Sequence, residues 1–131
     1  MTDIDARVSE LRTQGRCCAQ IVVRLALEER GEENEQLAEA VGALCGGMSS
    51  GLGCGALAGG AVAMWVLAGG PVDGAVVAEL VERFRERHGS TECGAILGGD
   101  RSARHTTCPP LIAGTYAEVR DLLHARGLLQ A

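Results

Sequence analysis

The sequence predicts an all-α fold, a compact bundle of about five to six helices around a central apolar helix at about residues 54–68. Of the 131 residues, 47% are apolar, yet there is only one Trp, one Tyr and one Phe. The core must therefore be filled by Ala, Val, Leu and Gly, which let helices approach closely. β-Sandwiches draw instead on aromatic and β-branched residues. The length is that of one domain, which we expect to span residues 1–131.

The first third of the chain predicts three helices, because apolar residues recur there at helical spacing. Residues 3–14 and 17–30 each carry an apolar stripe and are each followed by a glycine stop. Asn34 is a good N-cap for a third helix that runs to about Leu44.

The middle of the chain is glycine-rich and then continuously apolar. Residues 46–53 form a connection that requires positive φ or close backbone contact. Residues 54–68 form a helix that is apolar on every side. The uncharged stretch 41–72 is long enough to span a bilayer. Its first half holds glycines and serines, however, and a helix apolar all round is also expected at the centre of a bundle. We therefore expect a buried helix and no membrane span.

The remaining sequence predicts one strongly amphipathic helix over residues 72–88 and a short helical turn near 93–98. A loop carrying Cys108-Pro109-Pro110 should then lead to a final helix at about 111–126.

Charge and leader composition exclude several classes of protein. A net charge of −5 argues against a nucleic-acid partner, because phosphate neutralisation needs an excess of cations. The acidic N-terminus does not resemble a secretory signal, so we expect a cytoplasmic protein. Six cysteines in such a chain should be reduced thiols, metal ligands or catalytic groups, not a permanent disulfide framework.

An internal echo singles out two of these cysteines. Cys54-Gly-Ala-Leu-Ala-Gly-Gly and Cys93-Gly-Ala-Ile-Leu-Gly-Gly match at the cysteine, the next two residues and both final glycines. Each cysteine precedes helical sequence, where free N–H groups and the helix dipole would lower a thiol pKa. The small Gly-Ala pair lets a second sulfur or a metal approach. The alternative is that both cysteines pack as small apolar residues.

The other cysteines differ in what their positions suggest. Cys18 begins the second predicted helix, so the same dipole argument applies. Of the adjacent Cys17 and Cys18, we expect one to be functional and the other to pack as a structural residue. Cys45 ends the third predicted helix and is expected to be structural. Cys108 precedes two prolines, which would place its thiol on a defined loop, where functional groups are common.

Basic residues near the last cysteine could assist it. His105 lies three residues before it, a workable metal-ligand spacing, although a lone histidine there is more often solvated. Arg101 and Arg104 could place positive charge near a thiolate. His88 and His124 are expected only to interact with helix ends. No Cys-x-x-Cys occurs, which excludes the thioredoxin motif and common zinc spacings.

Taken together, these segments resemble a bacterial and archaeal family described as putative redox-active proteins, named for its C–GCAxxG–C–C cysteine order. The resemblance covers roughly residues 15–110. It rests on Gly15-Arg-Cys-Cys18-Ala-Gln, Gly46-Gly-Met, the two echoed segments and Cys108, and it makes Cys18, Cys54, Cys93 and Cys108 the first to last family cysteines. Two departures are a glycine between Cys54 and Ala56, and the additional Cys17 and Cys45.

The resemblance implies a small cytoplasmic redox protein, and related domains in some multihaem cytochromes hold an iron–sulfur cluster. Three functions stay open. The first is electron or thiol–disulfide transfer by clustered cysteines, with a redox partner protein. The second is an iron–sulfur or other metal site, in which four thiolates act as ligands. The third is a non-enzymatic interaction module whose apolar helix packs in a homo-oligomer. The residues proposed as catalytic, or as metal ligands, are Cys18, Cys54, Cys93 and Cys108.

Overall fold

The computed structural model describes residues 3–129, and over that range it consists of α-helices and short helical turns without a β-strand. This confirms the predicted all-α class. The elements in chain order are α1 (Asp3–Thr13), α2 (Cys18–Arg30), α3 (Glu35–Ala40), η1 (Val41–Leu44), η2 (Gly47–Gly51), α4 (Gly55–Ala68), α5 (Gly74–His88), α6 (Cys93–Ile96), η3 (Arg101–Ala103) and α7 (Arg104–Ala125). Met1 and Thr2 of the expected non-secretory N-terminus lie outside the described residues.

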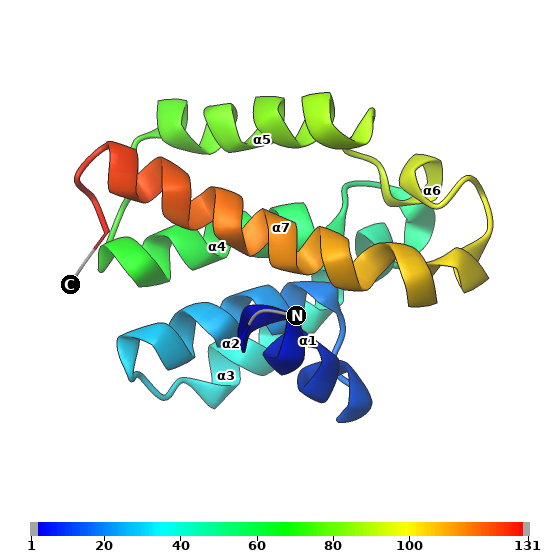
Figure 1. The fold of residues 1–131 in the computed structure, drawn as a ribbon, viewed down its shortest axis with the longest axis horizontal. Coiled ribbons are helices and arrows are strands. Elements are labelled where there is room, and N and C mark those ends of the chain that lie inside the picture. The colour runs from blue at the N-terminus through cyan, green and yellow to red at the C-terminus, as the bar shows by residue number, and fades with distance from the viewer. Residues whose placement is uncertain (1–2, 130–131) are drawn as a thin grey trace.

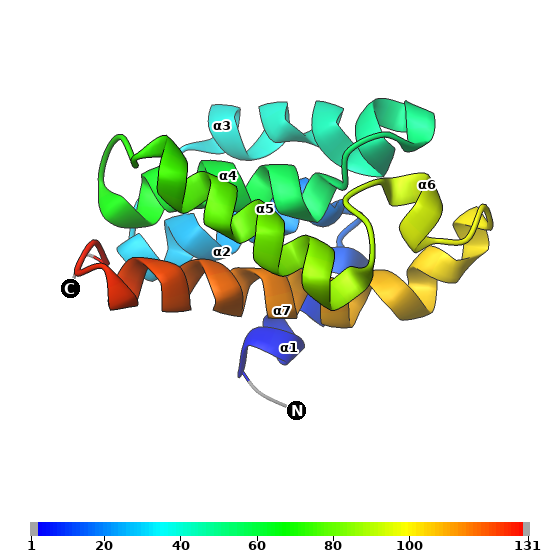
Figure 2. The same cartoon turned by 90° about the horizontal axis from the view of Figure 1, so that it is seen from above.

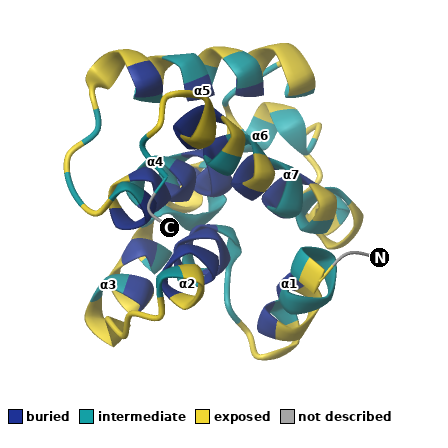
Figure 3. Ribbon diagram, turned by 60° about the vertical axis from the view of Figure 1, so that its left-hand side comes forward, coloured by how far each residue is buried: buried dark blue, intermediate teal, exposed yellow. Residues whose placement is uncertain are grey.

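Helix α4 lies at the centre of the bundle, as its composition predicts. It packs against α2, α7 and α5, while α1 packs on α7 and α2 (Figures 1 and 2). Its residues are largely buried, as Figure 3 shows, and Trp65 is the one side chain of α4 that is more than half exposed, at 56%. Within the described chain, no helix is long and apolar enough to cross a membrane.

Missing side chains let α2 and α4 approach closely. A Cβ added at Gly59 would lie 2.9 Å from both the Cα and the carbonyl oxygen of Ala19 on α2. Real Cβ atoms do not come this close to backbone, so only glycine fits at this crossing. The small residues of the sequence therefore bring two helices, and the cysteines at their N-terminal ends, close together.

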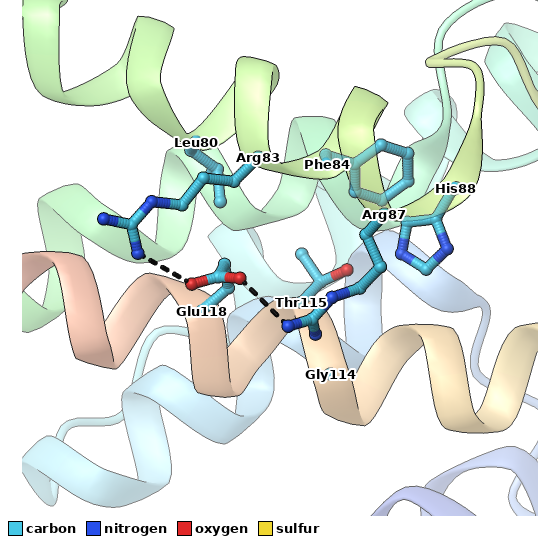
Figure 4. Close-up of a pocket in the computed structure, with 8 residues that line it drawn as sticks. All are labelled: Leu80, Arg83, Phe84, Arg87, His88, Gly114, Thr115 and Glu118. Atoms are coloured by element: carbon cyan, nitrogen blue, oxygen red, sulfur yellow. Dashed lines mark hydrogen bonds and ion pairs between the residues drawn. The ribbon is translucent and has the colours of Figure 1, made fainter.

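Polar contacts join the outer helices to the bundle. Figure 4 shows Glu118 of α7 between Arg83 and Arg87 of α5, at 3.0 and 3.2 Å. These three residues line a hollow of about 10 Å³. His88, at the end of α5, lies against the ring of Phe84, with the ring centroids 4.4 Å apart. The two ion pairs join α5 to α7, and no cysteine lines the hollow between them.

Glycine stops set most helix boundaries where the sequence predicts them. Gly31, Gly69 and Gly89 end α2, α4 and α5 in the left-handed conformation. Asn34 caps α3 by accepting a hydrogen bond from the backbone N–H of Leu37. The third predicted helix is shorter than expected, however, since its last turn, η1, is a 3-10 helix.

The glycine-rich connection adopts the positive φ that its composition predicts. Gly46, Gly47 and Gly51 all have φ between 62° and 75°. Met48 and Ser49, which are not glycine, have φ of 57° as well. This sharply turned segment lies beside α6 at one end of the bundle.

The prediction of a loop at Cys108-Pro109-Pro110 is wrong, because all three residues lie inside α7, which begins at Arg104. Proline lacks the N–H that would bond to the carbonyl four residues earlier, here those of His105 and Thr106. His105 and Thr106 are both exposed, so water can donate hydrogen bonds to their carbonyls instead. The free energy that the helix loses by containing two prolines is thereby reduced. The helix starts at Arg104, about two turns before the start that the prolines predict.

Candidate functional site

Cys54 and Cys93 are held together by a short backbone bridge. The Cys54 N–H donates to the Thr91 carbonyl, and the Cys93 N–H donates to the Leu52 carbonyl, each at 2.7 Å. Cys54 is the N-cap of α4, and Cys93 is the first residue of α6. The two echoed segments thus begin at helix N-termini, and a pair of equivalent backbone hydrogen bonds joins these two N-termini. Their final glycines differ in role: the first pair packs inside α4, and the second pair ends α6 with positive φ.

Cys18 lies against the first echoed segment. A Cβ added at Gly55 would be 2.7 Å from the Cys18 Sγ and 3.1 Å from the Cys45 Cα. The glycine after Cys54 therefore leaves the space in which the Cys18 sulfur lies. The Cys-Gly-Ala sequence predicts that a second sulfur or a metal can approach here, and in the structure the approaching group is a sulfur.

Cys108 completes the group from the second turn of α7. It borders a cavity of about 670 Å³. Residues of α6, η2 and the start of α7 line this cavity, and Figures 1 and 2 show these elements at the same end of the bundle. We call this cavity the cysteine pocket. Apart from glycines, Ser49 and Leu97, the lining residues are Cys17, Cys18, Cys45, Cys93, Cys108, Arg12, Arg16, Arg101 and Arg104. Cys54 is not on the wall and is only 7% exposed.

Burial is the main cause of the perturbed thiol pKa values. It raises the pKa of Cys54 to about 11, although the N–H groups of Ala56 and Leu57 act in the opposite direction. It also raises the pKa of Cys18 and of Cys108. The expected lowering of the pKa by a helix N-terminus is therefore wrong for Cys18 and Cys54. Hydrogen bonds to the thiolate are present, but desolvation outweighs them.

The four free thiols are close enough to influence one another. Beyond burial, ionised Cys93 or Cys108 raises the pKa of Cys18, and ionised Cys18 or Cys93 raises that of Cys54. Ionised Cys54 or Cys93 likewise raises the pKa of Cys108. These influences cover all six pairings of the four residues. The geometry agrees with these influences, because Cys18, Cys93 and Cys108 line one cavity and the Cys54 backbone is hydrogen-bonded to the segment that precedes Cys93.

The remaining two cysteines form a disulfide, Cys17–Cys45, which the sequence does not predict. In this structure the pair is therefore neither reduced nor a pair of metal ligands, which differs from the reduced state expected for the cysteines. The Cys45 sulfur also accepts a hydrogen bond from the Ala19 N–H at 3.4 Å. No local signal links the two residues, because they lie in different elements and are 28 positions apart. The disulfide and Cys18 border the same pocket.

The fit of a metal can be tested against these positions. Among residues 3–129, no three side chains of His, Cys, Asp or Glu are placed so that they could share one metal ion. The four thiols interact electrostatically, but in this arrangement they do not form a ligand set. His105 is exposed and is not among the residues lining the pocket, whereas Arg101 and Arg104 line it, as their place in the sequence suggests.

The fold and the site together define a helical protein whose cysteines gather at one end of the bundle. The family described as Putative redox-active protein (C_GCAxxG_C_C) matches residues 16–122, and the chain belongs to this family. No curated protein and no solved structure matches it. The roles of Cys18, Cys54, Cys93 and Cys108 as catalytic residues or metal ligands stay predictions.

Proposed function

We propose that this protein is a thiol–disulfide electron carrier, in which Cys18, Cys93 and Cys108 in the wall of the cysteine pocket, together with the buried Cys54 next to them, store and release electron pairs. The observation that carries this proposal is the convergence of four free thiols from four segments: Cys18, Cys93 and Cys108 line one cavity beside an existing disulfide, and the Cys54 backbone is hydrogen-bonded to the segment that carries Cys93. Inert structural cysteines would have no reason to share one open cavity.

The chemistry needs two thiols and an acceptor. One thiolate attacks a disulfide of the acceptor, forms a mixed disulfide and expels one acceptor thiolate. A second cysteine then attacks the protein sulfur of the mixed disulfide and expels the other acceptor thiolate. The protein loses two electrons and two protons, and the acceptor disulfide gains them. The reverse sequence returns the electrons to the protein.

A redox partner protein is part of this proposal. Ser49 and Gly51 of η2 line the pocket, and on the same segment Met48 is 55% exposed. The adjoining Leu52 is 51% exposed. Apolar side chains beside a reactive pocket favour a protein that docks there and exchanges electrons with the thiols.

The test is a count of free thiols before and after mild oxidation. Protein is reduced completely, freed of reductant and treated with a small excess of diamide under native conditions. We expect two or more of the four free thiols to be lost as intramolecular disulfides and to return on reduction. The double variant Cys17→Ala/Cys45→Ala serves as the control, because every disulfide lost or gained in it must come from the other four cysteines.

Two outcomes would contradict the proposal. Thiols in the control variant that stay reduced until the protein is denatured would leave only the interaction-module hypothesis. Protein purified without oxygen that is brown, with visible absorption lost in Cys18→Ala or Cys93→Ala, would establish the iron–sulfur alternative instead.

A further inference from the structure

The cysteine pocket has a charge opposite to that of the whole chain. The chain has a net charge of −5, yet Arg12, Arg16, Arg101 and Arg104 line the pocket, and no Asp or Glu does. The cavity, at about 670 Å³, has the size of small-molecule sites, which are about 300–1,000 Å³. The positive charges of the four arginines therefore all act on a ligand that enters the cavity.

Most of these arginines have no acidic partner. Among the described residues, Arg12, Arg101 and Arg104 form no ion pair, whereas Arg16 pairs with Glu39 at 2.7 Å. Asp100, which directly precedes Arg101, accepts hydrogen bonds from the N–H and the hydroxyl of Ser102 instead, at 3.0 and 2.6 Å. Elsewhere on the molecule, arginines pair with glutamates, as Arg7, Arg24, Arg83 and Arg120 do. The unpaired charge is thus concentrated at the pocket.

The arginines approach from different sides. Arg12 lies near the end of α1, and Arg104 begins α7. Arg101 extends from η3 toward the glycine-rich connection, where its Nη2 lies 3.5 Å from the position that a Cβ would take at Gly46. Guanidinium groups arranged around a cavity suit carboxylates, with which they form paired hydrogen bonds.

We propose that the cysteine pocket takes a small anionic disulfide, one that carries carboxylates, as its substrate. This inference rests on the proposed function, since it names the acceptor of the electron pair. The carboxylates bind the arginines, and the disulfide lies beside Cys93 and Cys108. One cysteine thiolate attacks a substrate sulfur and releases the first substrate thiol, and a second cysteine closes a protein disulfide and releases the other. The two thiol protons of the protein end on the two product thiols.

The experiment compares three small disulfides that differ in charge. Fully reduced protein, freed of reductant, is mixed with glutathione disulfide, which is anionic, hydroxyethyl disulfide, which is neutral, or cystamine, which is cationic. The release of small-molecule thiol is followed in a single turnover. We expect glutathione disulfide to react at least about tenfold faster than cystamine, relative to their rates with free dithiothreitol. That advantage should shrink as salt is raised.

A matched set of variants locates the effect. Arg101→Gln/Arg104→Gln should lower the rate with glutathione disulfide by about tenfold more than the rate with hydroxyethyl disulfide, which reports the effect that the loss of Arg104 has through the Cys108 pKa alone. Arg85→Gln is the control, because Arg85 is exposed on α5 and pairs there with Glu82. It should leave every rate unchanged.

The outcomes separate this inference from the function on which it rests. Similar normalised rates for the three disulfides, or equal losses in the pocket variant and in Arg85→Gln, would overturn the anionic substrate and leave the electron carrier intact. No reaction with any of the three would overturn the anionic substrate, and it would overturn the electron carrier as well if diamide also left the four thiols reduced.

Discussion

Gly55 shows how one missing side chain can position a reactive group. The Cys18 sulfur lies 2.7 Å from the position that a Cβ would take here, and the Cys45 Cα and the Leu44 carbonyl oxygen each lie 3.1 Å from it. The small residue after Cys54 could be recognised from the sequence as room for another group. Which group approaches it could not, because Cys18 is distant in the chain and arrives through the packing of α2 on α4.

The first prediction concerns this glycine. Gly55→Ala should lower the free energy of unfolding by about 1–3 kcal/mol, because two of the three nearest atoms belong to the backbone and cannot rotate away. It should also displace the Cys18 sulfur and change its alkylation rate. Gly74→Ala, at the start of α5, is the matched control, since nothing lies within 4 Å of its added Cβ. Equal stability of the two variants in urea denaturation would contradict the close contact.

The second prediction follows from the buried thiol of Cys54. Its pKa is about 11 in the folded protein, against 9.0 as the usual value. Between these pH values the unfolded chain releases a proton that the folded chain keeps, so stability falls as pH rises. At about 1.4 kcal/mol per pKa unit, the loss attributable to Cys54 is about 2–3 kcal/mol.

Urea denaturation of the reduced protein from pH 8 to 11 measures this loss. Cys54→Ala should show a shallower decline than the native sequence over that interval, since it has no thiol at that position to ionise. Identical pH profiles for the two proteins would mean that Cys54 is solvated as freely in the folded chain as in the unfolded one.

At the scale of helices, local signals predict most of the fold. Glycine stops and the Asn34 cap place the ends of α2, α4 and α5 and the start of α3 where the structure has them. The prolines misplace the start of α7, because their effect depends on whether solvent reaches the freed carbonyls. Sequence spacing carries no information about that exposure.

The third prediction tests the early start of α7. Pro109→Ala/Pro110→Ala restores two N–H groups that can bond to the carbonyls of His105 and Thr106, so the first turns of α7 should be stabilised. We expect slower hydrogen exchange at the amides of residues 107, 108, 111 and 112, and a rise in unfolding free energy of about 1–3 kcal/mol. Unchanged exchange in this segment would mean that residues 104–108 are not helical in solution.

At the scale of the whole molecule, the fold brings together what the sequence keeps apart. The identity of the four cysteines could be predicted from the echo and from the family resemblance. Their convergence could not be, because it depends on the bridge between Leu52–Cys54 and Thr91–Cys93 and on the crossing of α2 and α4. The Cys17–Cys45 disulfide and the contribution of Arg12 and Arg16 arise in the same way, from elements that meet only in the folded chain.

Disulfide mapping is the most direct test that the four thiols, three in the pocket wall and Cys54 next to them, lie close enough to react with one another. Reduced protein is oxidised with diamide, either folded or in urea, then alkylated, digested and analysed by mass spectrometry. In the folded monomer we expect bonds that join Cys18, Cys54, Cys93 and Cys108 to one another, and in urea a broader set that favours residues near in sequence. The same bonds in both states, or none among these four when folded, would contradict a shared pocket.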